Sequence, residues 1–184
     1  DMIDVSLIDN NMLTLSFQPV KISHMIRLLK TEFKDTLDHR QQSVEIFDFP
    51  EDESWVLADN ERIYQALRNV FTNAIKYTPN NGWISVRGRL LPGFIEITIA
   101  DTGIGISPEN QTLIFEKFGQ LGRVDLHSSG KTKFKGGGAG LGLPITRGII
   151  EAHGGSIWVE SEGHDEVNCP GSTFHILLPT RTES

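Results

Sequence analysis

Cysteine is scarce in this sequence: Cys169 is the single one among 184 residues. One cysteine cannot form an internal disulfide and offers no thiolate zinc site, so a reducing, cytoplasmic location is expected. Long apolar runs are missing too, because no 18 apolar residues follow one another, and no signal peptide opens the chain. Positive charge is in deficit. The net charge of −7 disfavours a surface that binds nucleic acid.

The remaining composition is that of an ordinary globular domain. With 38% hydrophobic and 22% charged residues, a chain of this length is expected to form one domain with a sizeable core. Because the first residue is Asp1 and not Met, we expect a segment of a longer protein, in which a membrane anchor could lie outside this chain.

Apolar spacing and turn residues predict the secondary structure. Helices are predicted over residues 22–37, 60–77 and 143–153, with Asp59 or Asn60 capping the second one. A strand over residues 13–17 is predicted to end at Pro19. Further strands are predicted at 44–49 and 55–58 around an acidic turn, at 83–90 and 94–100 as a hairpin, at 156–161 and at 173–178. These elements predict an α/β (α+β) fold, a two-layer sandwich whose mixed sheet has helices on one face.

The predicted helix over 60–77 carries an unusual polar stripe. Arg62, Asn69, Asn73 and Lys76 fall on one side of it, away from the apolar residues. Asparagine is a poor helix former, and amide oxygens can ligate Mg²⁺ that also binds substrate phosphates, with Lys76 balancing their charge. A solvated face that happens to contain asparagine explains the stripe equally well.

Two glycine-rich segments lie in the stretch 101–142, which holds no long periodic run and is therefore either functional or disordered. Asp101 follows an apolar strand and precedes a glycine turn, where a carboxylate could accept an exocyclic amine of adenine. A strand end with a capping aspartate is the commoner reason for such a pattern. The glycine run 136–142 could cradle phosphate before a helix or serve as a linker, and it fits neither a Walker A loop nor a Rossmann fingerprint.

Five segments in sequence order resemble the motifs of one family. Residues 69–78, 101–106, 115–118, 138–145 and 171–174 are similar to the N, first glycine, F and second glycine boxes and the terminal strand of the sensor histidine kinase ATP-binding domain. That domain belongs to the superfamily of gyrase, heat-shock chaperone and mismatch-repair ATPases. The resemblance covers residues 11–179 and implies a Bergerat-type ATP-binding fold, with five or more strands and about three helices on one face. Residues 11–184 would form this domain, and 1–10 would end a preceding dimerisation and phosphoacceptor helix.

The resemblance implies a role for individual residues. Asn73 would be the main Mg²⁺ ligand with Asn69 in support, and Lys76 and Tyr77 would contact phosphate and the rim of ATP. Asp101 would accept the adenine amine. The remaining implied nucleotide contacts are Gly103, Gly105, Ile106, Phe118, Gly138, Gly140, Leu141, Gly142, Leu143 and Thr173. Residues 116–137 would form a lid based on Phe115 and Phe118, whose Arg123, Lys131, Lys133 and Lys135 are equal candidates to meet the γ-phosphate.

The implied reaction is phosphoryl transfer from ATP to a histidine. Asn69 and Lys76 would serve catalysis, and Asn69 stands where the hydrolysing relatives have a glutamate that activates water, so hydrolysis is disfavoured. None of the six histidines in this chain has the surroundings of the acceptor, which would lie on a separate dimerisation domain. The phosphoryl group would then pass to a response-regulator receiver domain, and the isolated segment is expected to be monomeric. The alternatives are a degenerate nucleotide-binding or docking module, and a serine kinase or ATPase of the same superfamily.

Overall fold

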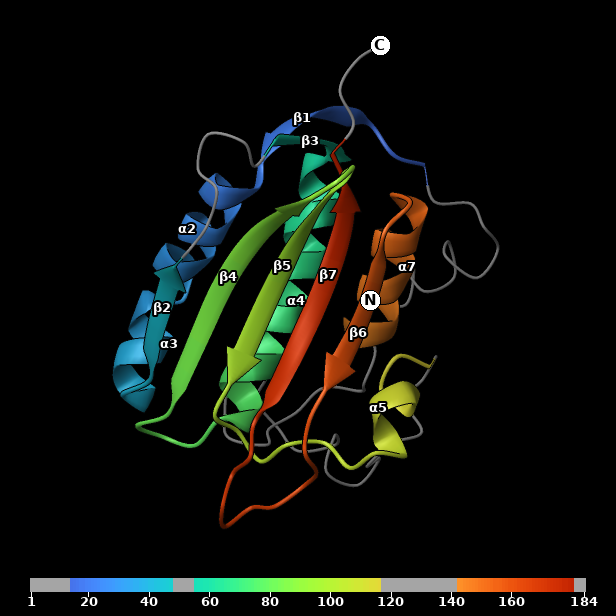
Figure 1. Cartoon of the computed structure of the whole chain (residues 1–184). Helices are drawn as coiled ribbons and strands as arrows, with labels where there is room; N and C mark the ends of the chain where they lie inside the picture. The colour runs from blue at the N-terminus through green and yellow to red at the C-terminus, as the bar shows by residue number, and fades with distance from the viewer. Residues whose placement is uncertain (1–13, 48–54, 117–141, 181–184) are drawn as a thin grey trace.

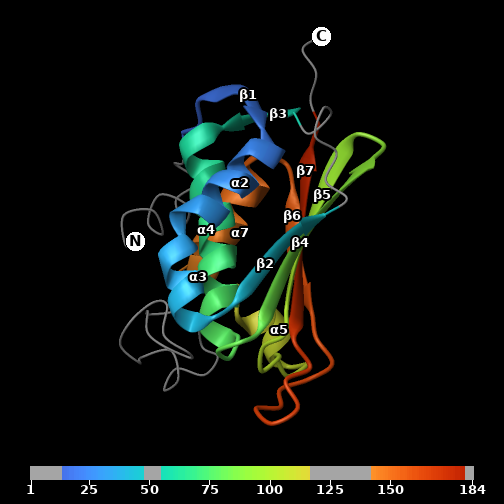
Figure 2. The same ribbon diagram turned by 90° about the vertical axis from the view of Figure 1, so that its left-hand side faces the viewer.

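The computed structural model describes residues 14–47, 55–116 and 142–180. A five-stranded sheet forms one layer, and three long helices cover one of its faces (Figure 1, Figure 2). These helices are α2 (Ile22–Glu32), α4 (Asn60–Tyr77) and α7 (Gly142–Ala152). The predicted two-layer sandwich with a mixed sheet is therefore confirmed. Within the described ranges, no helix is long and apolar enough to cross a membrane.

The sheet has the strand order β2-β4-β5-β7-β6. Its strands are β2 (Ser43–Phe47), β4 (Trp83–Leu91), β5 (Phe94–Asp101), β6 (Ser156–Glu160) and β7 (Ser172–Pro179). Only β2 and β4 pair in parallel; the other neighbours in this sheet are antiparallel. The predicted hairpin is confirmed as β4 and β5, which turn at Gly93 with a φ of 80°. Strand β5 is central, so its last residue, Asp101, is flanked by strands on both sides.

Helix α4 packs its apolar face into the core. The side chains that recur at three- and four-residue spacing are buried as predicted: Ile63, Leu67, Val70, Phe71, Ala74 and Ile75. Each fully buried Ile, Leu or Phe side chain contributes about 1.5–3 kcal/mol to stability. Because burial of this face fixes the rotation of the helix about its axis, it also fixes the direction of the polar stripe with Asn69 and Asn73.

Both ends of α4 are held by side chains. Asp59 caps its start, since the Asp59 Oδ1 accepts the backbone N–H of Arg62 at 3.1 Å. At its end, the buried guanidinium of Arg40 donates to the carbonyl oxygens of Ile75 at 3.0 Å and Thr78 at 2.5 Å. The Gln42 amide donates to the same two oxygens at 3.1 and 2.8 Å. The carbonyls that a helix leaves unpaired at its C-terminus are thus satisfied from another element.

The first strand differs from the prediction. Strand β1 (Phe17–Lys21) contains Pro19 instead of ending before it, and it pairs antiparallel with β3 (Trp55–Asp59) in a separate two-stranded sheet. An edge strand tolerates proline because one of its sides forms no ladder. The strands on either side of the acidic turn do not pair with each other, since β2 joins β4 and β3 joins β1.

The helix predicted over residues 22–37 is two helices, α2 and α3 (Lys34–Arg40). The break lies at Phe33, whose φ of −98° and ψ of 14° leave the helical region. The predicted apolar positions are nevertheless buried, and the Phe33 ring lies 5.8 Å from the ring of Phe71 on α4. Neither proline nor glycine marks the break, so packing between helices sets it and no local signal predicts it.

A short helix, α5 (Asn110–Leu113), interrupts the glycine-rich stretch and was not predicted. Several predictions lie outside the described residues. These are the preceding helix at 1–10, nearly all of the lid at 116–137 with Arg123, Lys131, Lys133 and Lys135, and the positions Phe118, Gly138, Gly140 and Leu141.

Candidate functional site

The described site residues come together at one end of the molecule, the lower end in Figure 1. The last turns of α4, the end of β5 and the starts of β7 and α7 meet there. The Asn69 side-chain amide donates to the carbonyl of Gly142 at 3.1 Å, which joins residues 73 positions apart. The N–H of Ile104 donates to the carbonyl of Tyr77 at 3.2 Å and joins the turn after β5 to the end of α4. The second half of the polar stripe, the turn after Asp101 and Gly142 are therefore parts of one site.

Asn69 and Asn73 lie one turn apart on α4, and both are half-buried. Asn69 uses its NH₂ group on Gly142, so its carbonyl oxygen stays available. The side chain of Asn73 makes no hydrogen bond with any of the described residues. Among these residues, no cluster of three or more His, Cys, Asp or Glu could hold a metal ion. Two neutral amide oxygens fit a Mg²⁺ ion that takes its other ligands from water and phosphate.

Lys76 and Tyr77 occupy the last turn of α4. The Lys76 ammonium lies 5.1 Å from the centre of the Tyr77 ring, a cation–π contact, and both side chains are half-buried. Arg62, on the same stripe, lies two turns before Asn69 and donates to Gln65 at 3.1 Å. The stripe thus presents amides and an ammonium group at the site end of α4, while its arginine stays near the other end.

Asp101 lies on the helix-covered face of the sheet, in register with the buried Ile84. Its Oδ1 accepts the backbone N–H groups of Gly103 at 2.9 Å and Ser172 at 3.2 Å. Its Oδ2 accepts no hydrogen bond from the described residues. Burial raises the pKa of Asp101 to about 7, although these two hydrogen bonds act to lower it. The carboxyl group thus keeps one oxygen for an outside donor such as an exocyclic amine.

The turn after Asp101 needs its glycines for close packing. A Cβ at Gly103 would collide with the carbonyl oxygen of Tyr77, so this glycine lets the turn lie against the end of α4. Gly105 has a φ of 77°, and a Cβ there would collide with the carbonyl oxygen of Gly163. The fold itself therefore requires glycine at position 105, in addition to the contact with a base that the family resemblance implies.

Thr173 does not lie where the implied contact set would need it. It pairs with Ala100 and alternates with the buried Phe174, which places it on the face of the sheet away from α4. The neighbouring residue, Ser172, is the one that bonds Asp101. The side chain of Thr173 therefore lies on the sheet face opposite α4, whereas the backbone N–H of its neighbour Ser172 bonds the Asp101 carboxylate.

The second glycine segment is described from Gly142 on. Helix α7 begins at this residue, and the backbone N–H groups of its first turn favour an anion, except at Pro144, which has none. Leu143 is half-buried, and Thr146 donates to the Gly142 carbonyl at 2.8 Å. Phe115, the implied lid anchor, is buried with its ring 6.2 Å from that of Phe174.

Gln111 and Ser161 bond the turn after Asp101, and sequence reasoning missed both. The Gln111 amide donates to the carbonyl oxygens of Ile106 at 3.0 Å and Ser161 at 2.9 Å. The Ser161 hydroxyl accepts the N–H of Ile106 at 3.0 Å. The contacts span 50 and 55 positions, and isolated Ser or Gln residues form no pattern that could have predicted them.

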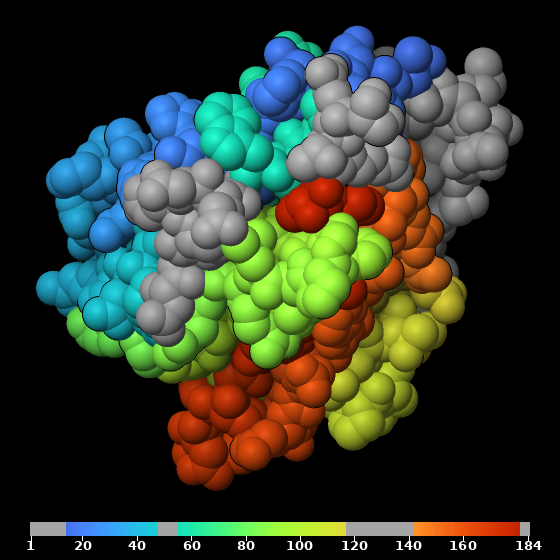
Figure 3. Space-filling model, turned by 45° about the horizontal axis from the view of Figure 1, so that its top comes forward, coloured from blue at the N-terminus to red at the C-terminus, as the bar shows by residue number. Residues whose placement is uncertain are grey.

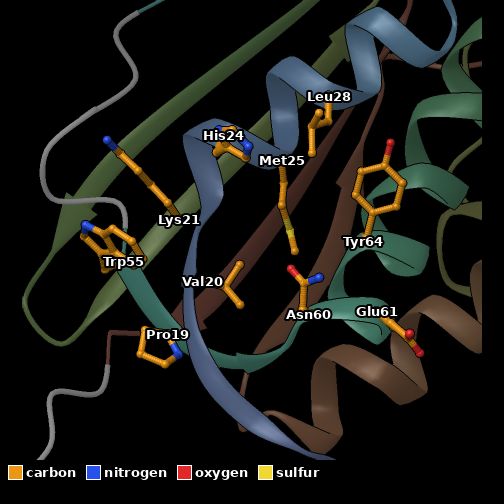
Figure 4. A pocket seen from close by; sticks show the side chains of 10 residues that line it. All are labelled: Pro19, Val20, Lys21, His24, Met25, Leu28, Trp55, Asn60, Glu61 and Tyr64. Carbon is orange, nitrogen blue, oxygen red and sulfur yellow. The ribbon is translucent and has the colours of Figure 1, made fainter.

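A groove of about 680 Å³ lies at the other end of α4 (Figure 4). Figure 3 turns this end towards the viewer, where residues of α2, β1 and β3 form part of the surface. The groove is lined by Pro19, Val20, Lys21, His24, Met25, Leu28, Trp55, Asn60, Glu61 and Tyr64. Its lining is mostly apolar and contains none of the glycine segments, so it is a poor match for a polyphosphate.

The chain matches one family model over residues 58–182, the model described as "Histidine kinase-, DNA gyrase B-, and HSP90-like ATPase". This range contains all the described residues of the candidate site. It includes the amide pair on α4, Asp101 and the start of α7.

Curated relatives share substantial sequence with the chain. The adaptive-response sensory kinase SasA of Trichormus variabilis is 40% identical over 149 residues, which cover 80% of this chain and 33% of that protein. The sensor histidine kinase WalK of Bacillus subtilis is 31% identical over 186 residues, covering 100% of this chain and 28% of that protein. The chain therefore spans about a third of the length of the curated relatives it matches.

Solved structures share the fold. The nucleotide-free catalytic domain of the histidine kinase ThkA superimposes with a TM-score of 0.71 at 27% identity, over 92% of this chain and 100% of that chain. Full-length ShkA in complex with AMPPNP superimposes with a TM-score of 0.77 at 26% identity, over 100% of this chain and 35% of that chain. ThkA in complex with the response regulator TrrA superimposes with a TM-score of 0.71 at 25% identity, over 98% of this chain and 47% of that chain.

Proposed function

Since the chain belongs to the histidine kinase-, DNA gyrase B- and HSP90-like ATPase family, and within it to the histidine kinase catalytic domains, we propose that it binds Mg·ATP and transfers the γ-phosphoryl group to a histidine of a separate dimerisation domain. One observation carries the proposal. The half-buried Asp101 keeps a free carboxylate oxygen on the same side of the sheet as the amide pair of α4.

The adenine lies against the turn after β5 in this proposal. The Oδ2 of Asp101 accepts the exocyclic amine, which selects adenine over guanine, since guanine presents a carbonyl at that position. Gly103, Gly105 and Ile106 line the base, and Tyr77 lies at the rim of the nucleotide. The backbone N–H of Ser172 holds the Asp101 carboxylate in place at 3.2 Å.

The phosphates lie between α4 and the start of α7. Asn73 and Asn69 would hold a Mg²⁺ ion, which neutralises phosphate charge when bound. The Lys76 ammonium contributes a further positive charge at the last turn of α4. Gly142 and Leu143, with Gly138, Gly140 and Leu141 from the implied second glycine box, line the triphosphate, and Phe118 belongs to the same contact set.

The chemical step is an in-line displacement at the γ-phosphorus. An imidazole nitrogen of the acceptor histidine attacks, a P–N bond forms and the P–O bond to ADP breaks, while the N–H proton of the imidazole passes to solvent water. This domain has no covalent part in that step. It positions the nucleotide and neutralises charge, which is what a loose phosphoryl-transfer transition state requires.

Water is a poor nucleophile in this site. The side chain of Asn69 is an amide that accepts no proton at neutral pH, and its NH₂ group is engaged by the Gly142 carbonyl. Where the hydrolysing relatives have a glutamate that activates water, this chain has Asn69, whose amide instead contacts Gly142. This favours transfer over hydrolysis.

The partners follow from the same chemistry. The acceptor histidine belongs to a dimerisation domain of the longer protein, and the phosphoryl group then moves to an aspartate of a response-regulator receiver domain. ThkA, which shares this fold, was solved in complex with the response regulator TrrA. We place the domain in the cytoplasm, where ATP is available, and expect the isolated segment to be monomeric.

Nucleotide binding and self-labelling of the chain test the proposal. Calorimetry should show that the chain binds Mg·ATP and Mg·ADP and loses affinity when EDTA removes the metal. With radioactive ATP labelled at the γ-phosphate, the chain alone should stay unlabelled, whereas the parent protein with its dimerisation domain should become labelled on histidine. The proposal is contradicted if no nucleotide binds, or if the chain labels itself.

A further inference from the structure

We propose that Gln111 is a positioning residue for the adenine end of the site: through its two hydrogen bonds it holds the turn Asp101–Ile106 in the shape that selects the adenine amine. This inference rests on the proposed function, because it concerns how the same site recognises its nucleotide. Gln111 belongs to α5, outside the segments that carry the family resemblance.

Gln111 bridges two segments that are distant in sequence. Its amide nitrogen donates to the carbonyl oxygens of Ile106 at 3.0 Å and Ser161 at 2.9 Å. The first carbonyl ends the turn after Asp101, and the second follows β6. Both distances are ordinary for N–H···O bonds, and the two N–H donors of one amide suit two acceptors. The side chain is half-buried, so these bonds are partly shielded from water.

The bridge adds side-chain bonds to the backbone bonds of α5, in which the N–H of Asn110 donates to Ser107 at 2.9 Å and that of Gln111 to Pro108 at 3.2 Å. This four-residue helix has no buried residue and no side-chain cap. Its side-chain connections to the rest of the fold come from the Gln111 amide and from the packing of Ile114 and Phe115 just after the helix. Removing the amide would free the carbonyl of Ile106 from this partner while the apolar packing stayed in place.

Ser161 closes the network on the opposite side. Its hydroxyl accepts the N–H of Ile106 at 3.0 Å and donates to the carbonyl of Gly171 at 2.7 Å. Gly171 in turn donates its N–H to the carbonyl of Gly103 at 2.9 Å. Both polar backbone groups of Ile106 are thus bonded to side chains, and the turn is fixed at Gly103 and Ile106.

Asp101 depends on the same frame. Its Oδ1 accepts the N–H groups of Gly103 and Ser172. The carbonyl of Gly103 belongs to the network, and Ser172 directly follows Gly171, which also belongs to it. A shift of the turn therefore rotates the carboxylate and displaces the Oδ2 that faces the exocyclic amine. The consequence is specific: loss of the Gln111 bonds should weaken the discrimination between adenine and a base without that amine.

The decisive variant is Gln111→Leu, which keeps the side-chain volume and removes both donors. Binding of Mg·ADP and of Mg·IDP, whose base lacks the amine, is measured by calorimetry well below the melting temperature. We expect the affinity for Mg·ADP to fall about tenfold, as for the loss of two modest hydrogen bonds, and the ADP-to-IDP preference to fall with it. A purely structural role would lower the melting temperature and leave the preference unchanged.

Two control variants separate position from stability. Ile114→Ala removes apolar packing next to α5 and should lower the melting temperature while preserving the ADP-to-IDP preference. Thr112→Ala changes an exposed side chain of the same helix and should alter neither. Similar losses of preference in Ile114→Ala and Gln111→Leu would assign the effect to general loosening of α5 and overturn the inference.

Gln111→Glu adds a test by rescue. Above the pKa of the new carboxyl group, its charge faces two carbonyl oxygens and should cost more affinity than leucine does. Protonation restores one donor, so the affinity of this variant relative to Gln111→Leu should rise as the pH falls. A constant ratio would contradict the inference. If the unmodified chain binds neither nucleotide, the proposed function itself fails, which is a different outcome from binding without any effect of Gln111.

Discussion

Asn69 and Asn73 are a turn apart, yet their surroundings differ. Asn69 is engaged by the carbonyl of Gly142, whereas Asn73 has no hydrogen bond with the described residues. An amide that is half-buried and unengaged gains most from a ligand that coordinates its oxygen. Asn73 is therefore the residue on which metal-dependent binding should depend most strongly.

Replacing Asn73 with alanine should abolish the Mg²⁺-dependent part of nucleotide affinity, a loss of at least about tenfold, while the fold stays intact. Calorimetry with Mg·ADP and with ADP in EDTA measures both parts. Gln65→Ala, on the same helix two turns earlier, is the matched control and should bind as the unmodified chain does. Equal losses in both variants, or none in Asn73→Ala, would remove the proposed metal role.

Asp101 makes nucleotide binding depend on pH. Burial raises its pKa to about 7, so near neutral pH much of the population is protonated. The adenine amine favours the ionised carboxylate, and binding should therefore release protons at about pH 6–7. Calorimetry in buffers of different ionisation enthalpy detects this release. Asp101→Asn should lose both the release and the adenine preference; proton release that persists in that variant would point to another group.

The same group affects stability with a definite sign. In the folded chain Asp101 holds its proton up to about pH 7, while in the unfolded chain it ionises near its ordinary value of 3.8. The contribution of Asp101 to the stability of the fold is thus fully present below pH 3.8 and is lost as the pH rises through about 7. Thermal melting should show the unmodified chain losing stability relative to Asp101→Asn across this window, and a gain would contradict the assignment.

Two glycines of the site should respond in opposite ways to alanine. Gly105 has a positive φ and no room for a Cβ beside Gly163, so Gly105→Ala should destabilise the fold by more than about 2 kcal/mol. The ideal Cβ of Gly142 lies 3.7 Å from its nearest neighbour, an ordinary contact, and alanine favours a helix start. Gly142→Ala should therefore melt at or above the temperature of the unmodified chain. Similar melting of the two variants would contradict this distinction.

At the scale of elements, the position of α4 decides the geometry of the site. Its start is fixed by Asp59 and its end by Arg40 and Gln42, which reach the carbonyls of Ile75 and Thr78. The last turn carries Lys76 and Tyr77. Because Arg40, Gln42 and the N–H of Ile104 bond carbonyls at this end, the last turn resists fraying and these two residues start from a defined position.

Arg40→Ala should reduce the free energy of unfolding by about 1–3 kcal/mol, because it removes a buried side chain and leaves the carbonyls of Ile75 and Thr78 with fewer donors. Urea denaturation measures it. Lys34→Ala is the control on the same helix: its pair with Asp38 is exposed, and its midpoint should hardly change. Equal midpoints for the two variants would show that the C-terminal cap of α4 adds nothing.

An element could be predicted when local residues determine it, and not when contacts between distant segments do. The boundaries of α4 follow from a local cap at Asp59 and a period that every turn repeats, and they were predicted closely. The break at Phe33 comes from packing on Phe71, and the parallel pairing of β2 with β4 joins distant segments. Such causes leave no local mark in the sequence, which is why those two features were missed.

At the scale of the whole molecule, the site also contains residues that local motifs identify and residues that only long-range contacts bring in. Asn73 and Asp101 stand in segments whose order along the chain identifies them, so sequence reasoning could name them. Gln111 contacts Ser161 across 50 positions, and Ser161 contacts Ile106 across 55, while single polar residues carry no period. The orientation of Thr173 has a third cause, because only the alternation along β7 decides which of two neighbouring side chains faces α4.

The two ends of α4 are chemically different, and this difference is the central claim. The site end combines amides, an ammonium group, a half-buried carboxyl and glycine turns, whereas the other end has the mostly apolar groove near Trp55. A polyphosphate and an adenine amine match the first end. The groove shares only the helix with it.

The most direct test is a nuclear magnetic resonance titration of the labelled chain with Mg·ADP, following the signals of Asn73, Asp101 and Gly103 at one end and the Trp55 indole at the other. Saturable shifts at the first three, with the Trp55 indole unmoved, are the predicted result. Shifts confined to Trp55 and its neighbours in the groove, or no shifts at all, would contradict the account.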